Sequence, residues 1–99
     1  MKLQMHSIHF DADKKLLDFI QQRLDKLETF YDRITDGEVF LRINNNNGIE
    51  NKTLEVKLIV PGATLFVREE SSTFEIAADR AVDALKTQII RHKEKMTAH

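Results

Sequence analysis

The fold is decided by one stretch of the sequence, residues 37–67, which reads GEVFLRINNNNGIENKTLEVKLIVPGATLFV. It contains three short runs in which apolar and polar residues alternate, the pattern of strands that bury one face. Asn44 to Gly48 reads as a turn with a solvated tip, since Asn47-Gly48 favours a hairpin, and Pro61-Gly62 is a second turn. The stretch therefore predicts three strands in an antiparallel meander. Their apolar positions are Val39, Leu41, Ile43, Leu54, Val56, Leu58, Val60, Ala63, Leu65 and Val67.

A further strand and a helix are predicted before the meander. Residues 2–8 alternate apolar and polar side chains, which is typical of a strand. Residues 14–31 place their apolar side chains on one helical stripe, and either Asp11 or Asp13 can cap the N-terminus of this helix. Gly37 is interpreted as a break between this helix and the meander.

A long second helix is predicted after the meander, from residue 74 to about residue 96, with one apolar stripe. Ser72 and Glu75 have the spacing of a capping box at its start. The predicted order β-α-β-β-β-α indicates an α+β fold, a two-layer sandwich with both helices on one face of a four-stranded sheet. Because the first strand reaches the meander through a helix, it can pair parallel with a neighbour. Residues 1–99 are predicted to form one domain.

Composition excludes several classes of protein. The chain has no cysteine, so disulfides, thiolate zinc sites and cysteine nucleophiles are excluded. No apolar run reaches membrane-spanning length and the N-terminus lacks the apolar segment of a secretory signal, which predicts a cytoplasmic protein without a membrane partner. No set of acid, base and nucleophile is visible, and the three glycines lie at predicted turns rather than in a phosphate-binding loop. We therefore expect no enzymatic activity, no cofactor and no small-molecule substrate.

The charges are balanced in number but segregated in position. The chain has 15 basic and 16 acidic residues, a net charge of −1, which alone argues against a nucleic-acid binder. On helical wheels, however, each helix has a basic shoulder, on the same rotational side of the apolar stripe. These shoulders carry Lys15, Arg23 and Lys26 in the first helix, and Arg80, Arg91 and Lys95 in the second. Two interpretations fit this pattern: a basic face that attracts phosphate, or solvated shoulders with a last helical turn that complements the helix dipole.

A metal site is not expected. His6, His9, Asp11 and Asp13 form the only cluster of metal-like composition. On a strand, however, the spacing of His6 and His9 places the two imidazoles on opposite faces. The ligand geometry that a metal needs is therefore not available, and a polar strand end followed by a helix cap explains these residues.

Several aromatic side chains have two possible roles. His92 lies near the apolar stripe of the second helix, where it can stack on a base or pack at the edge of the core; packing is favoured. Phe19 and Phe30 flank basic residues, and Phe40 and Phe66 point away from the apolar face of their strands. Aromatic rings among basic residues suggest stacking on single-stranded nucleic acid, but packing at the rim of the core is favoured for all four.

The second helix carries a recognisable pattern. Residues 74–95, FEIAADRAVDALKTQIIRHKEK, resemble the C-terminal helix of the ribosome hibernation factor family, which includes short hibernation promoting factors and YfiA-type ribosome-associated inhibitors. Residues 24–32, LDKLETFYD, resemble the end of that family's first helix. The predicted order of elements and the length also agree, so the resemblance covers nearly the whole chain.

The resemblance implies a fold similar to double-stranded-RNA-binding domains and a site on the small ribosomal subunit, in the channel of messenger and transfer RNA. It implies a stress-induced translation inhibitor that preserves idle or dimerised ribosomes, with ribosomal RNA as its partner and a monomeric free protein. Carried over by position, the basic RNA contacts are Arg23, Lys26, Arg91, Lys93 and Lys95. Lys86 and His92, in the same helix, are added as candidates.

This sequence departs from the family pattern at two positions of the second helix. Ala84 and Thr87 stand where family members often carry basic residues, and Lys86 between them can compensate from a different shoulder. The sequence is also expected to lack the extra C-terminal domain of long forms and the tail of the inhibitor type. The alternative function is a non-enzymatic protein-interaction domain that recruits a partner through its sheet face or an edge strand.

Overall fold

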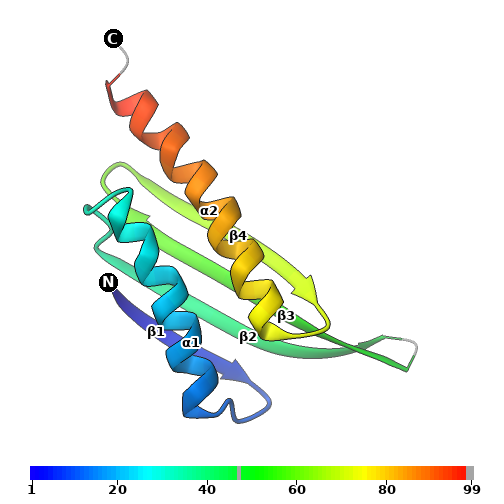
Figure 1. Cartoon of the computed structure of the whole chain (residues 1–99). Helices are drawn as coiled ribbons and strands as arrows, with labels where there is room; N and C mark the ends of the chain where they lie inside the picture. The colour runs from blue at the N-terminus through cyan, green and yellow to red at the C-terminus, as the bar shows by residue number, and fades with distance from the viewer. Residues whose placement is uncertain (47, 98–99) are drawn as a thin grey trace.

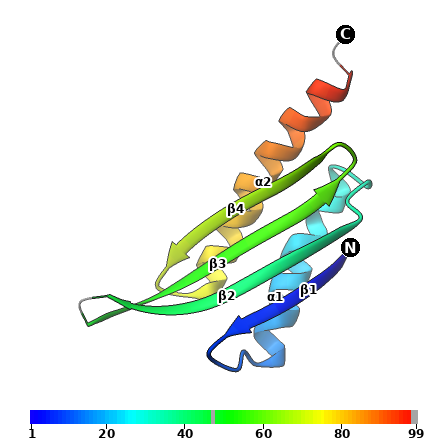
Figure 2. The same ribbon diagram turned by 180° about the vertical axis from the view of Figure 1, so that it is seen from behind.

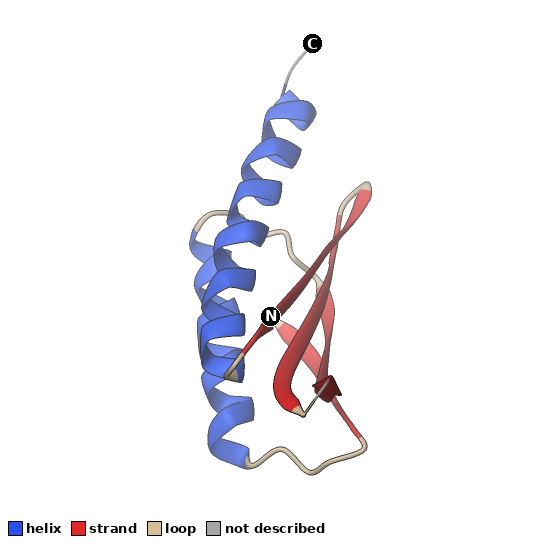
Figure 3. Cartoon of the chain, turned by 90° about the vertical axis from the view of Figure 1, so that its right-hand side faces the viewer, coloured by secondary structure: helices blue, strands red, loops and turns tan. Residues whose placement is uncertain are grey.

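A computed structural model describes residues 1–46 and 48–97 of the chain. The elements are β1 (Lys2–Ile8), α1 (Lys14–Asp25), the short 3-10 helix η1 (Lys26–Thr29), β2 (Asp36–Asn46), β3 (Ile49–Val60), β4 (Ala63–Ser71) and α2 (Phe74–Thr97). The strands form one sheet in the order β1-β2-β3-β4, in which β1 pairs parallel with β2 and the other pairs are antiparallel. Both helices cover the same face of the sheet (Figure 1, Figure 3). The predicted α+β two-layer sandwich and its parallel first strand are therefore confirmed.

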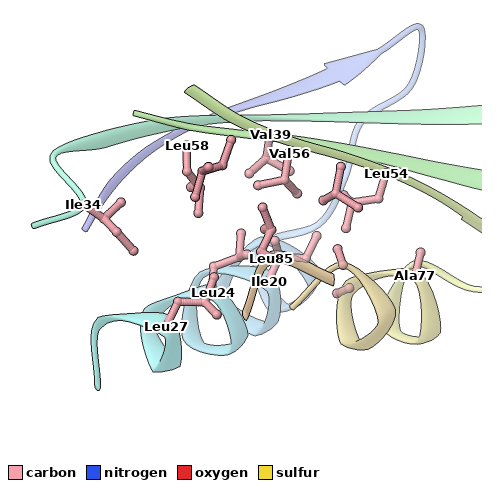
Figure 4. Packing of buried hydrophobic residues seen from close by; sticks show 14 of the residues in the cluster. Ile20, Leu24, Leu27, Ile34, Val39, Leu54, Val56, Leu58, Ala77 and Leu85 are labelled. Atoms are coloured by element: carbon pink, nitrogen blue, oxygen red, sulfur yellow. The ribbon is translucent and has the colours of Figure 1, made fainter. Parts of the chain in front are cut away.

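The core lies between the helices and the sheet. Ile20 and Leu24 of α1 and Leu85 of α2 point toward Val39 of β2 and Val56 of β3, and all five side chains are fully buried (Figure 4). Each such side chain contributes about 1.5–3 kcal/mol through removal of its apolar surface from water. The same packing holds the two helices side by side, so it also positions the polar side chains on their flanks.

The first helix is shorter than predicted. It begins as expected at an Asp13 cap, whose Oδ1 accepts a hydrogen bond of 2.8 Å from the Leu16 amide. The α-helix ends at Asp25, and the chain tightens into η1, where the Phe30 amide donates to the Leu27 carbonyl at 3.0 Å. The helical period therefore changes before residue 31, although the tighter turn still buries Tyr31.

The cap of α2 lies one residue later than predicted. The Thr73 Oγ1 accepts a hydrogen bond of 3.1 Å from the Ile76 amide, so Thr73 rather than Ser72 caps this helix. The expected capping box between Ser72 and Glu75 is wrong, because the helix begins at Phe74, whose ring is buried in the core.

Gly37 does not break the chain, contrary to its interpretation from sequence. It lies inside β2, between Leu3 of β1 and Leu58 of β3, and pairs with both residues in register. A Cβ at this position would approach the Leu3 Cδ2 to 2.6 Å and the Leu58 Cδ2 to 2.8 Å. A larger residue here would therefore require the ends of both leucine side chains to shift.

The β2–β3 hairpin is longer than predicted. Asn44 to Asn46 belong to β2 instead of a turn, and Asn46 pairs with Ile49 at the end of the hairpin. Gly48 has φ of +78°, a left-handed conformation that suits glycine; Asn47, the other residue of the expected turn, lies outside the described residues. The hairpin extends beyond β1 and β4 as a two-stranded ribbon (Figure 2).

Candidate nucleic-acid interface

The two helices run parallel and side by side, and this arrangement decides where their basic shoulders lie (Figure 1). Arg23 of α1 faces α2, since its Nε lies 3.3 Å from the Asp79 Oδ1. On α2, the Gln88 Nε2 donates a hydrogen bond of 2.8 Å to the Phe66 carbonyl of β4. The shoulders do lie on the same rotational side, but in parallel helices one of them faces the neighbouring helix and the other faces β4. The two basic shoulders therefore do not join into one continuous face.

One group of basic side chains, the interhelical cluster, gathers where α1 and η1 meet α2. It consists of Arg23, Lys26, Lys86 and Lys93. The Lys86 Nζ lies 4.4 Å from the centroid of the Phe30 ring, and the Lys93 Nζ donates a hydrogen bond of 2.7 Å to the Phe30 carbonyl. Lys26 follows Arg23 by three residues and lies one turn further along the same flank. The structure thus brings Arg23, Lys86 and Lys93, three of the seven predicted contact residues, to the junction of the helices, and helical spacing places Lys26 on the same flank.

A second group, the β4-side cluster, lies on the opposite flank of α2 and consists of Arg80, Arg91 and Lys95. Arg91 and Lys95 line a shallow hollow together with Gln88, His92, Ala63 and Leu65. Arg80 lies on the same flank by helical spacing, eleven residues or about three turns before Arg91. Ala84 stands between them on this flank, so the departure from the family pattern leaves a gap in the cluster.

His92 is committed to packing at the edge of the core, as the sequence favoured. Its Nε2 lies 3.0 Å from the Pro61 carbonyl oxygen, which requires that this nitrogen carries the proton and donates it. Its ring contacts Tyr31 edge to face, with 5.9 Å between centroids. This position connects the C-terminal half of α2 to the β3–β4 turn and so orients the neighbouring Arg91 and Lys95.

Acidic side chains of α1 and η1 gather on the side that faces β1, away from α2. Asp25 and Glu28 form ion pairs with the amino group of Met1, and Gln21 donates to the Asp25 Oδ1 at 2.9 Å. Hydrogen bonding to Glu28 raises the pKa of this amino group; burial opposes the effect, and Asp25 adds to it. The carboxylates of Asp25 and Glu28 thereby lie on the flank of α1 and η1 that is opposite the interhelical cluster. Within the interhelical cluster, Asp79 is the acidic partner of Arg23.

Comparison with known proteins identifies the family. A model of the family described as "Sigma 54 modulation protein / S30EA ribosomal protein" matches residues 3–97. The chain belongs to this family. The ribosome hibernation promoting factor of Azotobacter vinelandii is 30% identical over 95 residues, which cover 96% of this chain and 85% of that protein. The ribosome hibernation promoting factor of Salmonella typhimurium is 27% identical over 99 residues, the full length of both chains.

A solved structure supports the same fold. A ribosomal subunit interface protein from Coxiella burnetii superposes with a TM-score of 0.84 at 22% identity, covering 94% of this chain and 98% of that one. The likeness confirms the α+β architecture, and the family match confirms the resemblance found in the sequence.

The aromatic side chains fall into two groups in this member of the S30EA family. Phe19 packs at the rim of the core with the Arg23 guanidinium 4.7 Å from its ring centroid, and Phe30 is 38% exposed. Phe40 and Phe66 alternate with the buried residues of their strands, so both lie on the sheet face that the helices leave open. Phe40 stacks there on the His6 ring at 4.8 Å, and Phe66 is 50% exposed. Rim packing, favoured from sequence, is therefore wrong for Phe40 and Phe66.

The candidates for a metal site do not converge. His6 contacts Glu38, with 3.2 Å between Nε2 and Oε2, while His9 lies in the loop after β1 with φ of +63°. Within residues 1–46 and 48–97, no group of three or more His, Asp or Glu side chains is placed to hold a metal ion. Over the same residues, no helix is both long enough and apolar enough to cross a membrane.

Proposed function

We propose that this chain is a ribosome hibernation factor that binds ribosomal RNA of the small subunit. In this role it occupies the channel of messenger and transfer RNA and stabilises idle or dimerised ribosomes under stress. Residues 1–99 act as one cytoplasmic, monomeric binding domain without enzymatic activity. The observation that carries the proposal is the placement of basic side chains on both flanks of the C-terminal half of α2, in a member of the S30EA family whose net charge is −1.

The mechanism is electrostatic positioning followed by steric occlusion. Lys86 and Lys93 on one flank of α2, and Arg91 and Lys95 on the other, neutralise phosphates and release counterions. Such contacts position the protein on RNA by shape and carry no sequence information directly. On α1, Lys26 adds to this set, and Arg23 joins it by sharing its guanidinium between Asp79 and a phosphate. His92 supports the surface through its bond to Pro61 and contacts no RNA in this proposal.

Cosedimentation with purified small subunits over a salt series tests the proposal. With about six phosphate contacts, affinity should fall about 300- to 1,800-fold between about 50 and 200 mM salt. Purified large subunits serve as the matched control and should bind weakly at every salt concentration. Absence of small-subunit binding at low salt would rule the proposal out.

A protein-interaction domain is a second candidate, favoured by the open face of the sheet. Phe66 and Ile59 are exposed there, on β4 and β3 respectively. Strand addition at β4 is less suitable, because Gln88 already occupies the Phe66 carbonyl. A partner recovered by pull-down after nuclease treatment and lost in Phe66→Ser, together with absence of small-subunit binding by the parent chain, would support this role in place of RNA binding.

A further inference from the structure

Phe30 is exposed although its neighbour in the chain is buried. Tyr31 continues the apolar stripe of α1 into the core, where it is 9% exposed, whereas Phe30 lies off this stripe and is 38% exposed at the surface. Folding alone favours the reverse arrangement, since a phenyl ring has no polar group and a tyrosine hydroxyl is easily hydrated. The position of Phe30 is therefore not explained by the core.

Two lysines of α2 hold the Phe30 residue from different sides. The Lys86 ammonium lies over the face of the ring, 4.4 Å from its centroid, and the Lys93 ammonium bonds to the backbone carbonyl. These lysines lie two helical turns apart on the flank of α2 that faces α1, so their charges bracket the ring along the helix. The flat apolar face of the Phe30 ring and the ammonium groups of two lysines thereby lie next to one another in the interhelical cluster.

A hollow beside the ring supplies acceptors as well as one of the two cations. It is lined by Glu28, Thr29, Phe30, Tyr31, Asp32 and Lys93. The exposed Asp32 carboxylate repels a bare phosphate, but it can accept a hydrogen bond from the exocyclic amino group of a base. The chemistry around Phe30 therefore matches a nucleotide. The base would face the Phe30 ring and Asp32, and the phosphate would face the two lysines.

We infer that Phe30 is a stacking platform for an unpaired RNA base, with Lys86 and Lys93 binding the adjoining phosphate. The inference rests on the proposed RNA-binding function and names one contact within it. The base takes the place of the Lys86 ammonium on the ring, and the released ammonium then pairs with phosphate. Aromatic rings interleaved with cations are the usual means of holding single-stranded nucleic acid. An acidic peptide would use the two lysines but has no use for the ring.

The chain contains no tryptophan, so Phe30→Trp introduces a single fluorescent reporter at the proposed platform. Oligocytidylate is expected to quench this fluorescence by stacking on the indole, whereas an abasic oligonucleotide of equal length and charge should not. Phe30→Leu keeps an apolar side chain of similar size but removes the ring. This variant should bind oligocytidylate and small subunits about five- to tenfold more weakly than the parent chain.

Phe66→Leu, the same change on the open face of the sheet, is the matched control and should leave both affinities unchanged. Circular dichroism establishes that each variant is folded. Two results would overturn the inference. One is that neither oligocytidylate nor small subunits quench the fluorescence of Phe30→Trp. The other is that folded Phe30→Leu binds small subunits with unchanged affinity. In that case salt-dependent binding of the parent chain to small subunits still supports the proposed function, whereas its absence removes the proposed function itself.

Discussion

Replacing Arg91 and Lys95 together by glutamine tests whether the β4-side cluster contacts RNA phosphates. Both side chains are exposed, and they lie one helical turn apart beside the hollow against β4. If each neutralises one phosphate, the slope of log affinity against log salt becomes less steep by about 1.4–1.8 units. From equal binding at about 1 M salt, that change corresponds to about 25- to 60-fold weaker binding at about 0.1 M.

The assay is cosedimentation with small subunits at several salt concentrations. Replacing Lys57 and Arg68 by glutamine removes the same charge from the open face of the sheet, so this variant is the matched control and should keep the parent slope. Because cations near a helix C-terminus also stabilise the helix, by about 0.3–1 kcal/mol, thermal melts must show that both variants are folded. An equal loss in the control would refute the reasoning, since it would mean that net charge and not position controls binding. An unchanged slope in the Arg91 and Lys95 variant would refute it as well.

Three further predictions concern stability. Gly37→Ala should destabilise the fold by about 1–3 kcal/mol through crowding in the core, seen as a lower midpoint in thermal melts, and an unchanged midpoint would contradict the packing account. Thr73→Ala should cost about 0.5–2 kcal/mol by loss of the α2 cap, while Ser72→Ala should have little effect; equal losses would contradict the assignment of the cap. The raised pKa of the Met1 amino group implies stabilisation that is present below about pH 8, the unfolded pKa, and lost as pH rises through the folded pKa. Urea denaturation of Glu28→Gln should show a weaker decline of stability above pH 8 than the parent chain, and identical profiles would contradict the ion pair.

Local patterns were sufficient to predict the elements but not their ends. Alternation and helical stripes report burial directly, so the strands and helices could be predicted. Ser72 and Thr73 are both good caps, and the choice between them depends on Phe74, which must enter the helix in phase with the core. Gly37 has the composition of a break, but its role depends on Leu3 and Leu58, which approach it from other strands.

The candidate site was predictable in part for the same reason. The basic residue types were visible, and the sequence placed each on a shoulder of its own helix. A partner on another element leaves no local signal, so the Arg23–Asp79 pair and the contact of Lys86 with Phe30 could not be predicted. The exposure of Phe30, by contrast, agrees with the helical stripe, which carries Tyr31 and leaves Phe30 outside it.

The sequence by itself determined the order of elements, the face that each strand buries and the separation of charge around each helix. These properties depend on residues close in the chain, whose angular positions are set by backbone geometry. Only the tertiary structure decided that the basic shoulder of α1 faces α2 while that of α2 faces β4. A helical wheel measures angles against the helix's own apolar stripe. The neighbour found at each angle is set by the path of the chain across the sheet, which here makes the two helices parallel.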